Sequence, residues 1–303
     1  MSNNDVYTAM MKQYESSHNG KRDSGSQKTY DLKNYFNTQL PTGVNEATKR
    51  IRILPPADGQ KTPFTTMYGH KKKINGEWKT FPCLKHEKGE DCPFCQAREA
   101  LLATGREEDK ELAKQYSARQ MYIVKIIDRD KEHEGVKFWR FNHDYRKQGT
   151  HDKIMKAIMA VGHNITDVET GRDLNIEVAR DSNKIPAVQA VTYPLNASQL
   201  SSDAEKSKEW AGDTRTWEDV YSVRGYDYLE IIVKGDTPVW DKDEKRYVGK
   251  MELEAKGKTS DGYDDDGLED ELEIGSSFEK SEPVVAVAKA SEPDDEDDDD
   301  LPF

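Results

Sequence analysis

The sequence lacks the features of a membrane-spanning or secreted protein. No apolar run approaches the roughly 20 residues that span a bilayer, and residues 1–27 do not show the basic and then apolar order of a signal peptide. There are three cysteines, which are too few and too clustered for a disulfide framework, and no internal repeat is visible. We therefore expect a protein of a reducing, cytoplasmic setting.

Hydrophobic residues are also scarce. They make up 34% of the chain and charged residues make up another 34%, so we expect that part of the chain does not pack. The formal net charge of −13 is unevenly distributed, because residues 251–303 hold 20 acidic and 4 basic side chains. The rest of the chain holds 41 basic and 38 acidic side chains and is slightly basic.

The sequence predicts three parts. Residues 1–45 are polar with sparse aromatics, which favours a flexible arm that could mediate self-association. Residues 46–250 carry the signals of a folded core. Residues 251–303 end in EPDDEDDDDLPF, and because like charges repel one another, we expect a disordered acidic tail.

The core is predicted to be β-rich. Runs of β-branched and aromatic residues predict strands within 50–56, 62–81, 120–130, 136–145, 174–181 and 186–194. Asn75-Gly76 predicts a hairpin turn, and helices are predicted after Pro93, over 151–162 and over 201–212. Many short strands with few helices indicate an α+β fold with a small β-barrel core and insertions.

The three cysteines have the spacing of a metal site. Cys92 and Cys95 are separated by two residues in a CPFC motif, so both thiolates can bind one ion from a tight turn, and Cys83 supplies a third. A histidine would complete a tetrahedron. Spacing slightly favours His86, three residues after Cys83, over His70, which lies across the Asn-Gly hairpin. Four protein ligands leave no open position, so we expect one structural Zn²⁺.

Other interpretations of these cysteines remain open. They could be free thiols, or a redox CxxC pair, although such a pair usually follows a strand of a βαβ unit and has no need of Cys83. A base deaminase would also use cysteines for its zinc. However, no H-x-E precedes the pair, and the proline lies within it.

The interval 49–147 interleaves cations with aromatic rings. Sequence-tolerant binding of single strands needs cations for phosphates and aromatic faces for bases. The candidate contacts are Lys71, Lys72, Lys73, Tyr116, Arg119, Tyr122, Lys125, Trp139, Arg140, Tyr145, Arg146 and Lys147. In KFWRF (137–141) alternate residues share one side of the strand, and alternation leaves open which side is core. Ordinary core aromatics and a solvated basic face are the alternative.

The order of these parts resembles the single-stranded-DNA-binding (helix-destabilising) proteins of T-even-like bacteriophages. The resemblance is carried by RIRILPP, PFTTMYGHKKKINGEW, CPFCQ and YIVKIIDRDKEHEGVKFWRF, with an acidic C-terminal tail, and it covers roughly residues 46–195. It implies an OB-fold with an inserted zinc subdomain and a basic, aromatic-lined DNA cleft between them. In that family the histidine precedes the hairpin, so the resemblance assigns the metal to His70, Cys83, Cys92 and Cys95.

The resemblance also implies DNA contacts. The cleft residues of the family correspond to Tyr116, Arg119, Tyr122, Trp139, Arg140 and Tyr193. The N-terminal arm of the family carries a basic-Ser/Thr motif that drives head-to-tail cooperativity. Here residues 21–24, Lys-Arg-Asp-Ser, are only loosely similar to it, so the resemblance leaves cooperativity open.

The last residues of the tail have a distinct chemistry. DDDDLPF is similar to the tip of bacterial single-stranded-DNA-binding proteins. Because the last residue combines an apolar ring with the terminal carboxylate, a partner with a small apolar pocket rimmed by Arg or Lys could hold both. We expect replication and recombination proteins to bind the tip residues Asp299, Asp300, Leu301, Pro302 and Phe303.

The sequence therefore predicts a non-enzymatic protein, without catalytic residues, that coats single-stranded DNA during phage replication, recombination and repair in the bacterial host cell. One alternative is a zinc-ribbon protein-interaction or transcription accessory module. Another is a zinc-dependent nuclease or deaminase, which lacks support because no carboxylate–histidine arrangement with an open metal position is apparent.

Overall fold

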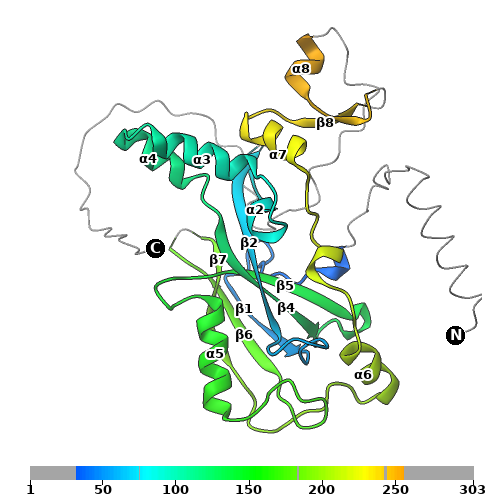
Figure 1. The fold of residues 1–303 in the computed structure, drawn as a ribbon. Helices are drawn as coiled ribbons and strands as arrows, with labels where there is room; N and C mark the ends of the chain where they lie inside the picture. Colours follow the sequence, from blue (N-terminus) through cyan, green and yellow to red (C-terminus); the bar gives the residue numbers. More distant parts are fainter. Residues whose placement is uncertain (1–31, 75, 183, 242–243, 256–303) are drawn as a thin grey trace, which may run out of the picture.

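A seven-stranded antiparallel sheet is the framework of the computed structural model, which describes residues 32–74, 76–182, 184–241 and 244–255 (Figure 1). Its strands are β1 (Glu46–Ile53), β2 (Phe64–Ile74), β3 (Glu77–Pro82), β4 (Arg119–Asp128), β5 (Val136–Asn142), β6 (Leu174–Arg180) and β7 (Pro186–Thr192). A separate ribbon consists of β8 (Pro238–Asp241) and β9 (Arg246–Gly249).

Short helices surround this sheet. They are α2 (Leu84–Glu87), α3 (Pro93–Ala103), α4 (Glu107–Lys114), α5 (Thr150–Val161), α6 (Ala204–Ala211), α7 (Tyr226–Val233) and α8 (Lys250–Ala255), with single 3-10 turns η1 (Leu32–Asn34), η2 (Glu132–Glu134) and η3 (Trp217–Asp219). Within the described part of the chain, none of them has the length and apolar character needed to cross a bilayer.

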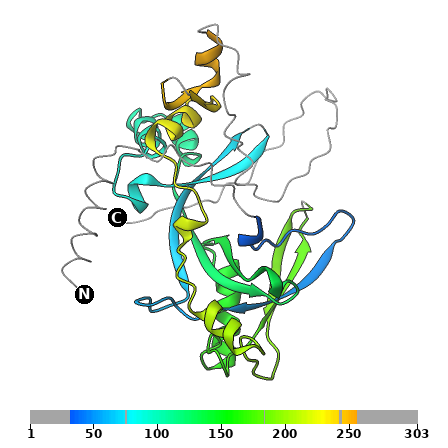
Figure 2. The same ribbon diagram turned by 90° about the vertical axis from the view of Figure 1, so that its right-hand side faces the viewer.

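Five strands curl into a half-barrel in the order β5-β4-β1-β6-β7 (Figures 1 and 2). β-branched and aromatic residues dominate β4 and β5, which suits a pleated and largely buried surface. The principal core fills the half-barrel, and α5 packs against β5 and β7. The predicted β-rich fold class is therefore confirmed.

Strand β2 joins the half-barrel to a second subdomain. Its residues 64–69 pair with β4, and its residues 69–74 pair with β3. Gly69 lies at the changeover, where a Cβ atom would approach the side chains of Met121 and Thr80 to 3.1 Å. Beyond that crowded point the same continuous strand carries His70 into the second subdomain.

The second subdomain has its own apolar core. Helix α7, far along the chain, packs against the segment inserted between β2 and β4. The core unites residues of β3, α2 and α3 with residues of α7: Phe81, Leu84, Phe94, Tyr228, Leu229 and Ile232. The subdomain is therefore assembled from two distant segments of the chain.

Both sides of strand β5 are covered. Trp139 and Phe141 point into the principal core, whereas Phe138 packs with Trp217 and Tyr221 on the other side. The segment that contains η3 therefore crosses the face of the sheet opposite the principal core. Neither side of the KFWRF run is a free aromatic surface.

Folded residues precede the predicted boundary at residue 46. Phe36 and Leu40 are buried in the principal core, and the Phe36 ring meets the Trp139 ring edge-on at 5.3 Å. The Tyr35 hydroxyl also donates to the Val220 carbonyl oxygen at 2.5 Å. The prediction of a flexible arm up to residue 45 is therefore wrong from Tyr35 to Leu40, and residues 1–31 lie outside the described residues.

The ordered chain also continues past residue 250. Helix α8 follows β9, and Leu253 packs with Val239 and Val248 in a small separate core. The rest of the predicted tail, residues 256–303 with its Pro-Phe tip, lies outside the described residues.

Arg52 is a charged residue inside the fold. Its side chain is fully buried, which lowers the pKa of the guanidinium. It donates to the Asp167 carbonyl oxygen at 2.6 Å and to Ser198 Oγ at 3.0 Å, and its Nη1 lies 3.5 Å from Asp173 Oδ1. Arg129 donates to the same Asp173 oxygen at 2.9 Å. One carboxylate thus compensates two buried cations.

Replacing Asp173 with alanine is expected to lower the free energy of unfolding by about 3 kcal/mol, because the buried Arg52 loses its carboxylate and Arg129 loses one of its two. Urea denaturation followed by circular dichroism measures this loss. The matched control is Glu132→Ala. Glu132 also pairs with Arg129, at 2.7 Å, but it is exposed, so its removal is expected to cost less than about 1 kcal/mol. Equal losses for the two variants would contradict the assignment.

Candidate metal centre and nucleic-acid interface

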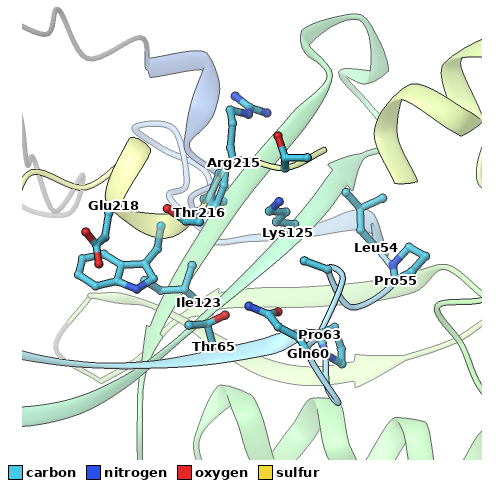
Figure 3. Close-up of a pocket in the computed structure, with 14 residues that line it drawn as sticks. Leu54, Pro55, Gln60, Pro63, Thr65, Ile123, Lys125, Arg215, Thr216 and Glu218 are labelled. Carbon is cyan, nitrogen blue, oxygen red and sulfur yellow. The ribbon is translucent and has the colours of Figure 1, made fainter. Parts of the chain in front are cut away.

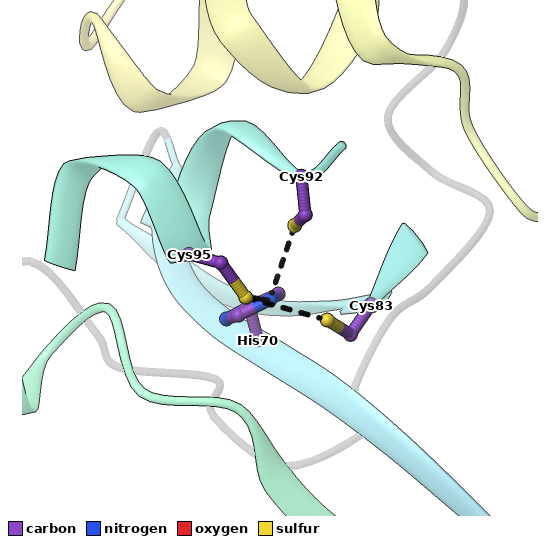
Figure 4. Close-up of side chains that lie close together, drawn as sticks. All are labelled: His70, Cys83, Cys92 and Cys95. Carbon is purple, nitrogen blue, oxygen red and sulfur yellow. Dashed lines mark hydrogen bonds between the residues drawn. The ribbon is translucent and has the colours of Figure 1, made fainter. Parts of the chain in front are cut away.

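Four side chains converge on one point in the second subdomain (Figure 4). The Nε2 atom of His70 lies 3.4 Å from Cys92 Sγ and 3.8 Å from Cys95 Sγ. Cys83 Sγ lies 3.6 Å from Cys95 Sγ. All four ligand atoms are within 4.8 Å of one another, and each side chain except the half-buried Cys95 is buried.

Local structure places each of these side chains. The β2–β3 hairpin brings His70 into register with the end of β3, immediately before Cys83. Cys92 is the N-cap of α3, and Pro93 occupies the first helical position, where its fixed φ suits a helix start. Cys95 falls in the first turn of the same helix. The CPFC motif is therefore a helix start that aims two sulfurs at the hairpin.

The spacing of these atoms fits a tetrahedral zinc site. Zn–S bonds of about 2.3 Å and Zn–N bonds of about 2.0 Å give edges of about 3.8 Å between sulfurs and about 3.5 Å between sulfur and nitrogen. The observed separations of 3.6, 3.4 and 3.8 Å lie close to these edges. One imidazole with three thiolates is also a donor set of structural zinc sites. The cluster could hold one metal ion.

The electrostatics of the cluster favour a cation at its centre. Burial alone would lower the pKa of His70, but the neighbouring sulfurs of Cys83 and Cys92 raise it to about 9. Hydrogen bonds from Cys83 and Cys95 hold the pKa of the Cys92 thiol far below its usual range, and the same crowding raises the pKa of Cys95. Buried thiolate charge needs compensation, which a divalent ion supplies.

The second nitrogen of His70 fixes the ring. Its Nδ1–H group donates to the Tyr116 carbonyl oxygen at 2.9 Å, which directs Nε2 at the sulfurs. The ring also stacks on Phe94, with centroids 4.7 Å apart. Because Tyr116 lies just before β4, this hydrogen bond ties the metal centre to the strand that enters the half-barrel.

His86, which local spacing favoured, does not belong to the group of four. Its Nδ1 atom lies 3.1 Å from Cys83 Sγ, and its ring stacks on Tyr68 at 4.7 Å. It is therefore placed to hydrogen-bond a ligand sulfur from outside the group. Pairing across the hairpin, which spacing along the chain does not express, selects His70.

One face of β2 links the metal centre to the half-barrel. Alternate residues of a strand share a face, so Phe64, Thr66, Tyr68, His70 and Lys72 form one row. At one end, the Lys72 ammonium lies 4.8 Å from the Tyr116 ring centroid. At the other end, Phe64 and the residues opposite it on β4 lead into a cluster of rings.

That cluster is a chain of five rings from β2, β4, α5 and the segment after β5. The ring centroids of Phe64 and His151 are 5.0 Å apart, and His151 stacks on Tyr122 at 3.9 Å with an angle of 12°. Tyr122 meets His143 at 5.7 Å, and His143 meets Tyr145 at 4.5 Å. Tyr145 is 72% exposed, so the chain of rings ends in solvent.

The ring of Tyr122 is held in place on several sides. Its hydroxyl lies 3.2 Å from His143 Nδ1 and accepts from Gln120 Nε2 at 3.4 Å. Burial lowers the pKa of His151, so a neutral imidazole supports the tyrosine face at pH 7. Neither histidine was among the residues predicted from the sequence. The β4–β5 register could have found His143, because Tyr122 pairs with Phe141, two residues before it.

Several predicted phosphate contacts carry charges that the described part of the chain leaves without a carboxylate partner: Lys72, Lys73, Arg119 and Lys147. Most are exposed and the rest half-buried. Several lysines elsewhere are paired with a carboxylate, as Lys85 is with Glu99 at 2.7 Å. Uncompensated cations beside aromatic rings are what binding to single-stranded nucleic acid requires.

The structure does not bring every predicted contact to this face. Trp139 is 3% exposed in the principal core, so the prediction that its ring meets bases is wrong. Lys125 is on the opposite face of β4, where it donates to the Asp213 carbonyl oxygen at 2.6 Å. On that face too, Arg140 lies 4.7 Å over the Tyr221 ring. Lys125 and Arg140 therefore contact the segment around η3 that crosses this face of the sheet.

Lys125 also lines a pocket between that segment and the sheet, with Leu54, Arg215 and Thr216 among its walls (Figure 3). Arg215 is held by Asp213, at 2.6 Å, as Lys125 is, so the two cations of the pocket are already compensated. Tyr193 is half-buried and packs against the principal core. The tail tip, Asp299 to Phe303, lies outside the described residues.

Comparison with known proteins agrees with this geometry. A search of curated proteins found no match. The family model described as "gp32 DNA binding protein like" matches residues 45–226, a span that contains the half-barrel, the Cys/His cluster and the chain of rings. The resemblance to the phage single-stranded-DNA-binding proteins is thereby confirmed. The chain belongs to the gp32-like DNA-binding protein family.

Proposed function

We propose that this protein coats single-stranded DNA, with little sequence preference, during phage DNA replication, recombination and repair. Family membership supports binding of single-stranded DNA. The observation that carries the proposal is the row of residues along β2, which joins a Cys/His cluster, a Lys72–Tyr116 pair and a chain of rings ending in an exposed tyrosine.

The proposed mechanism follows from these groups. Lysine and arginine side chains replace the counterions of phosphates, and the rings stack on bases of any identity. His70, Cys83, Cys92 and Cys95 would hold one structural Zn²⁺, which ties the segment before β4 to the hairpin. Binding single strands but not duplex shifts the melting equilibrium toward separated strands by mass action.

We infer a binding role and no catalysis. A zinc-dependent nuclease or deaminase needs an open coordination position, whereas here four protein side chains would fill a tetrahedron. A zinc-ribbon interaction module would explain the cluster, but it would leave the rings and uncompensated cations without a purpose. Loss of tyrosine and tryptophan emission on titration with poly-dT distinguishes the proposed function from such a module.

A gel-shift experiment tests the proposed function. The full chain is incubated with a labelled oligo-dT strand and with a duplex of the same length, before and after treatment with a zinc chelator. We expect a shift of the single strand only, and a weaker shift after chelation. Equal binding to the duplex would contradict the preference for single strands. Full binding by a protein shown to contain no metal would contradict the proposal that the metal stabilises the DNA-binding surface.

We further propose that the tail recruits replication and recombination proteins through Asp299–Phe303, and that the N-terminal arm mediates self-association along DNA. The support is chemical. The tip offers a ring, a carboxylate and flanking aspartates, which a small apolar pocket with basic rims can recognise.

Removing residues 256–303 is expected to tighten DNA binding at low salt. These residues hold 18 acidic and 4 basic side chains, and tethering gives them a high effective concentration near the basic surface. Cutting after Ala255 keeps α8 and its packing of Leu253 intact. Anisotropy titrations with labelled oligo-dT at low and high salt measure the effect. Unchanged affinity at low salt would contradict it.

A further inference from the structure

The tip of the β2–β3 hairpin presents a tryptophan to solvent. Trp78 is 50% exposed, whereas Trp139, Trp210 and Trp217 are at most 9% exposed and Trp240 is half-buried. Exposing a large indole on a hairpin is unfavourable unless something covers it. Trp78 belongs to none of the apolar clusters of the described residues.

The register shows which side chains share its face. Trp78 is directly opposite Lys73, and Thr80 is directly opposite Lys71, so these four form two cross-strand pairs on one side. Gly69 continues this side, since a Cβ there would meet the Thr80 side chain at 3.1 Å.

Arg119 extends the same side onto β4. It is directly opposite Gly69 and is exposed. Lys72 belongs to the other side of β2, where its ammonium lies over Tyr116. The ribbon of β2, β3 and β4 therefore carries cations and an aromatic ring on each of its two sides.

The chemistry of this second side fits a nucleic acid strand. Lys73 and Arg119 have no carboxylate partner among the described residues. Cations at every second residue of a strand are spaced by about 7 Å and can follow a line of phosphates. An exposed indole beside them offers a stacking face that is independent of base identity. An acidic peptide would satisfy the cations but would give the indole no planar partner.

We propose that Lys71, Lys73, Trp78 and Arg119 form a second contact for single-stranded DNA, which engages the strand where it passes around the hairpin, on the side opposite Lys72 and Tyr116. Trp78 stacks on a base, and the cations hold the flanking phosphates. The inference rests on the proposed function and adds a second surface that contacts the DNA strand.

Anisotropy titrations with a series of oligo-dT strands of increasing length test the proposal on the full chain. Short oligonucleotides are expected to occupy only the side that carries Lys72 and Tyr116, and longer ones are expected to reach the tip of the hairpin as well. Trp78→Ala is expected to weaken binding of the long strands by about 5- to 100-fold while leaving the short strands unchanged. Leu195→Ala is the matched control, because Leu195 is an apolar residue that is 85% exposed. Zinc content and circular dichroism of each variant confirm folding.

Tryptophan emission gives an independent measurement. Trp78→Phe keeps a ring but removes the exposed indole, so the quenching that long strands cause in the unmodified protein is expected to fall by more than half. Unchanged affinity at every length, or quenching that persists in Trp78→Phe, would overturn the second contact. Binding of an acidic peptide to this side without an effect of Trp78→Ala on DNA would also overturn it. Failure of the unmodified protein to bind any strand would instead overturn the proposed function.

Discussion

Replacing Cys92 with alanine is expected to abolish metal binding and to unfold the subdomain around the cluster, while the half-barrel stays folded. Apparent binding free energies of structural zinc in small domains are about 10–16 kcal/mol, and much of that energy is folding energy. The sulfur of Cys92 lies 3.4 Å from His70 Nε2 and is buried. Water therefore cannot readily take its place as the fourth ligand in the variant.

The separation of the cores explains why the loss should be local. The principal core of the half-barrel and the core around the cluster share no buried residue. The variant should therefore unfold in two thermal transitions, with the first at a much lower temperature than in the unmodified protein. Limited proteolysis should cut first within 83–118. Metal analysis should find about one zinc ion per unmodified chain, as expected for a four-ligand site, and none in Cys92→Ala.

His86→Ala is the matched control for this experiment. His86 touches Cys83 Sγ at 3.1 Å but lies outside the group of four, so its loss should weaken metal affinity by about 10- to 100-fold and leave the stoichiometry unchanged. His70→Ala should behave like Cys92→Ala. Metal retained by His70→Ala and lost by His86→Ala would show that the ligand set is the one that local spacing favoured.

Local signals in the sequence predicted much of the fold. The β-branched run 120–130 and the aromatic run 136–145 became β4 and β5, and the CPFC motif became a helix start. These features depend on propensity, turn chemistry and charge, which neighbouring residues determine.

The errors share a different physical origin. Phe36 and Leu40 were predicted to lie in a polar arm, because their burial depends on packing against strands that are distant in the sequence. Helix α7 supplies part of the core of the second subdomain from outside the inserted segment. Trp139 looked like a stacking residue because alternation shows that two faces exist but not what covers each of them. Contacts between residues far apart in sequence decided all of these cases.

The choice between His70 and His86 shows the same limit at the site. Spacing compares positions along the chain, whereas the metal centre is assembled across a hairpin in which His70 pairs with Phe81. The family resemblance selected His70 because it carries information about that pairing. The residues alone, without the register, slightly favoured His86.

Raising the salt concentration from 50 to 200 mM is expected to weaken binding to oligo-dT by about 300-fold. The estimate follows from a slope of about −0.7 per phosphate contact in a plot of log affinity against log salt, with six contacts. The six cations lie on the two sides of the ribbon of β2, β3 and β4 and after β5: Lys71, Lys72, Lys73, Arg119, Arg146 and Lys147. Fluorescence titrations at five salt concentrations measure the slope.

Single substitutions identify the groups that produce this slope. Lys72→Ala and Arg119→Ala should each reduce its magnitude by about 0.7, because each removes one phosphate contact. Lys85→Ala is the matched control, since Lys85 belongs to the same subdomain but is already paired with Glu99 at 2.7 Å. A slope near zero, or a slope that changes with Lys85 and not with Lys72 and Arg119, would contradict the assignment of these cations to phosphates.

The same titrations separate charge from stacking. Counterion release disappears from the free energy when the line is extrapolated to 1 M salt, so the affinity that remains there comes from contacts other than ion pairs. Tyr145→Ala should lower this remaining affinity by about 5- to 100-fold and leave the slope unchanged, because its exposed ring carries no charge. A change of slope in Tyr145→Ala would mean that the chain of rings positions Arg146 and Lys147 and does not itself stack on bases.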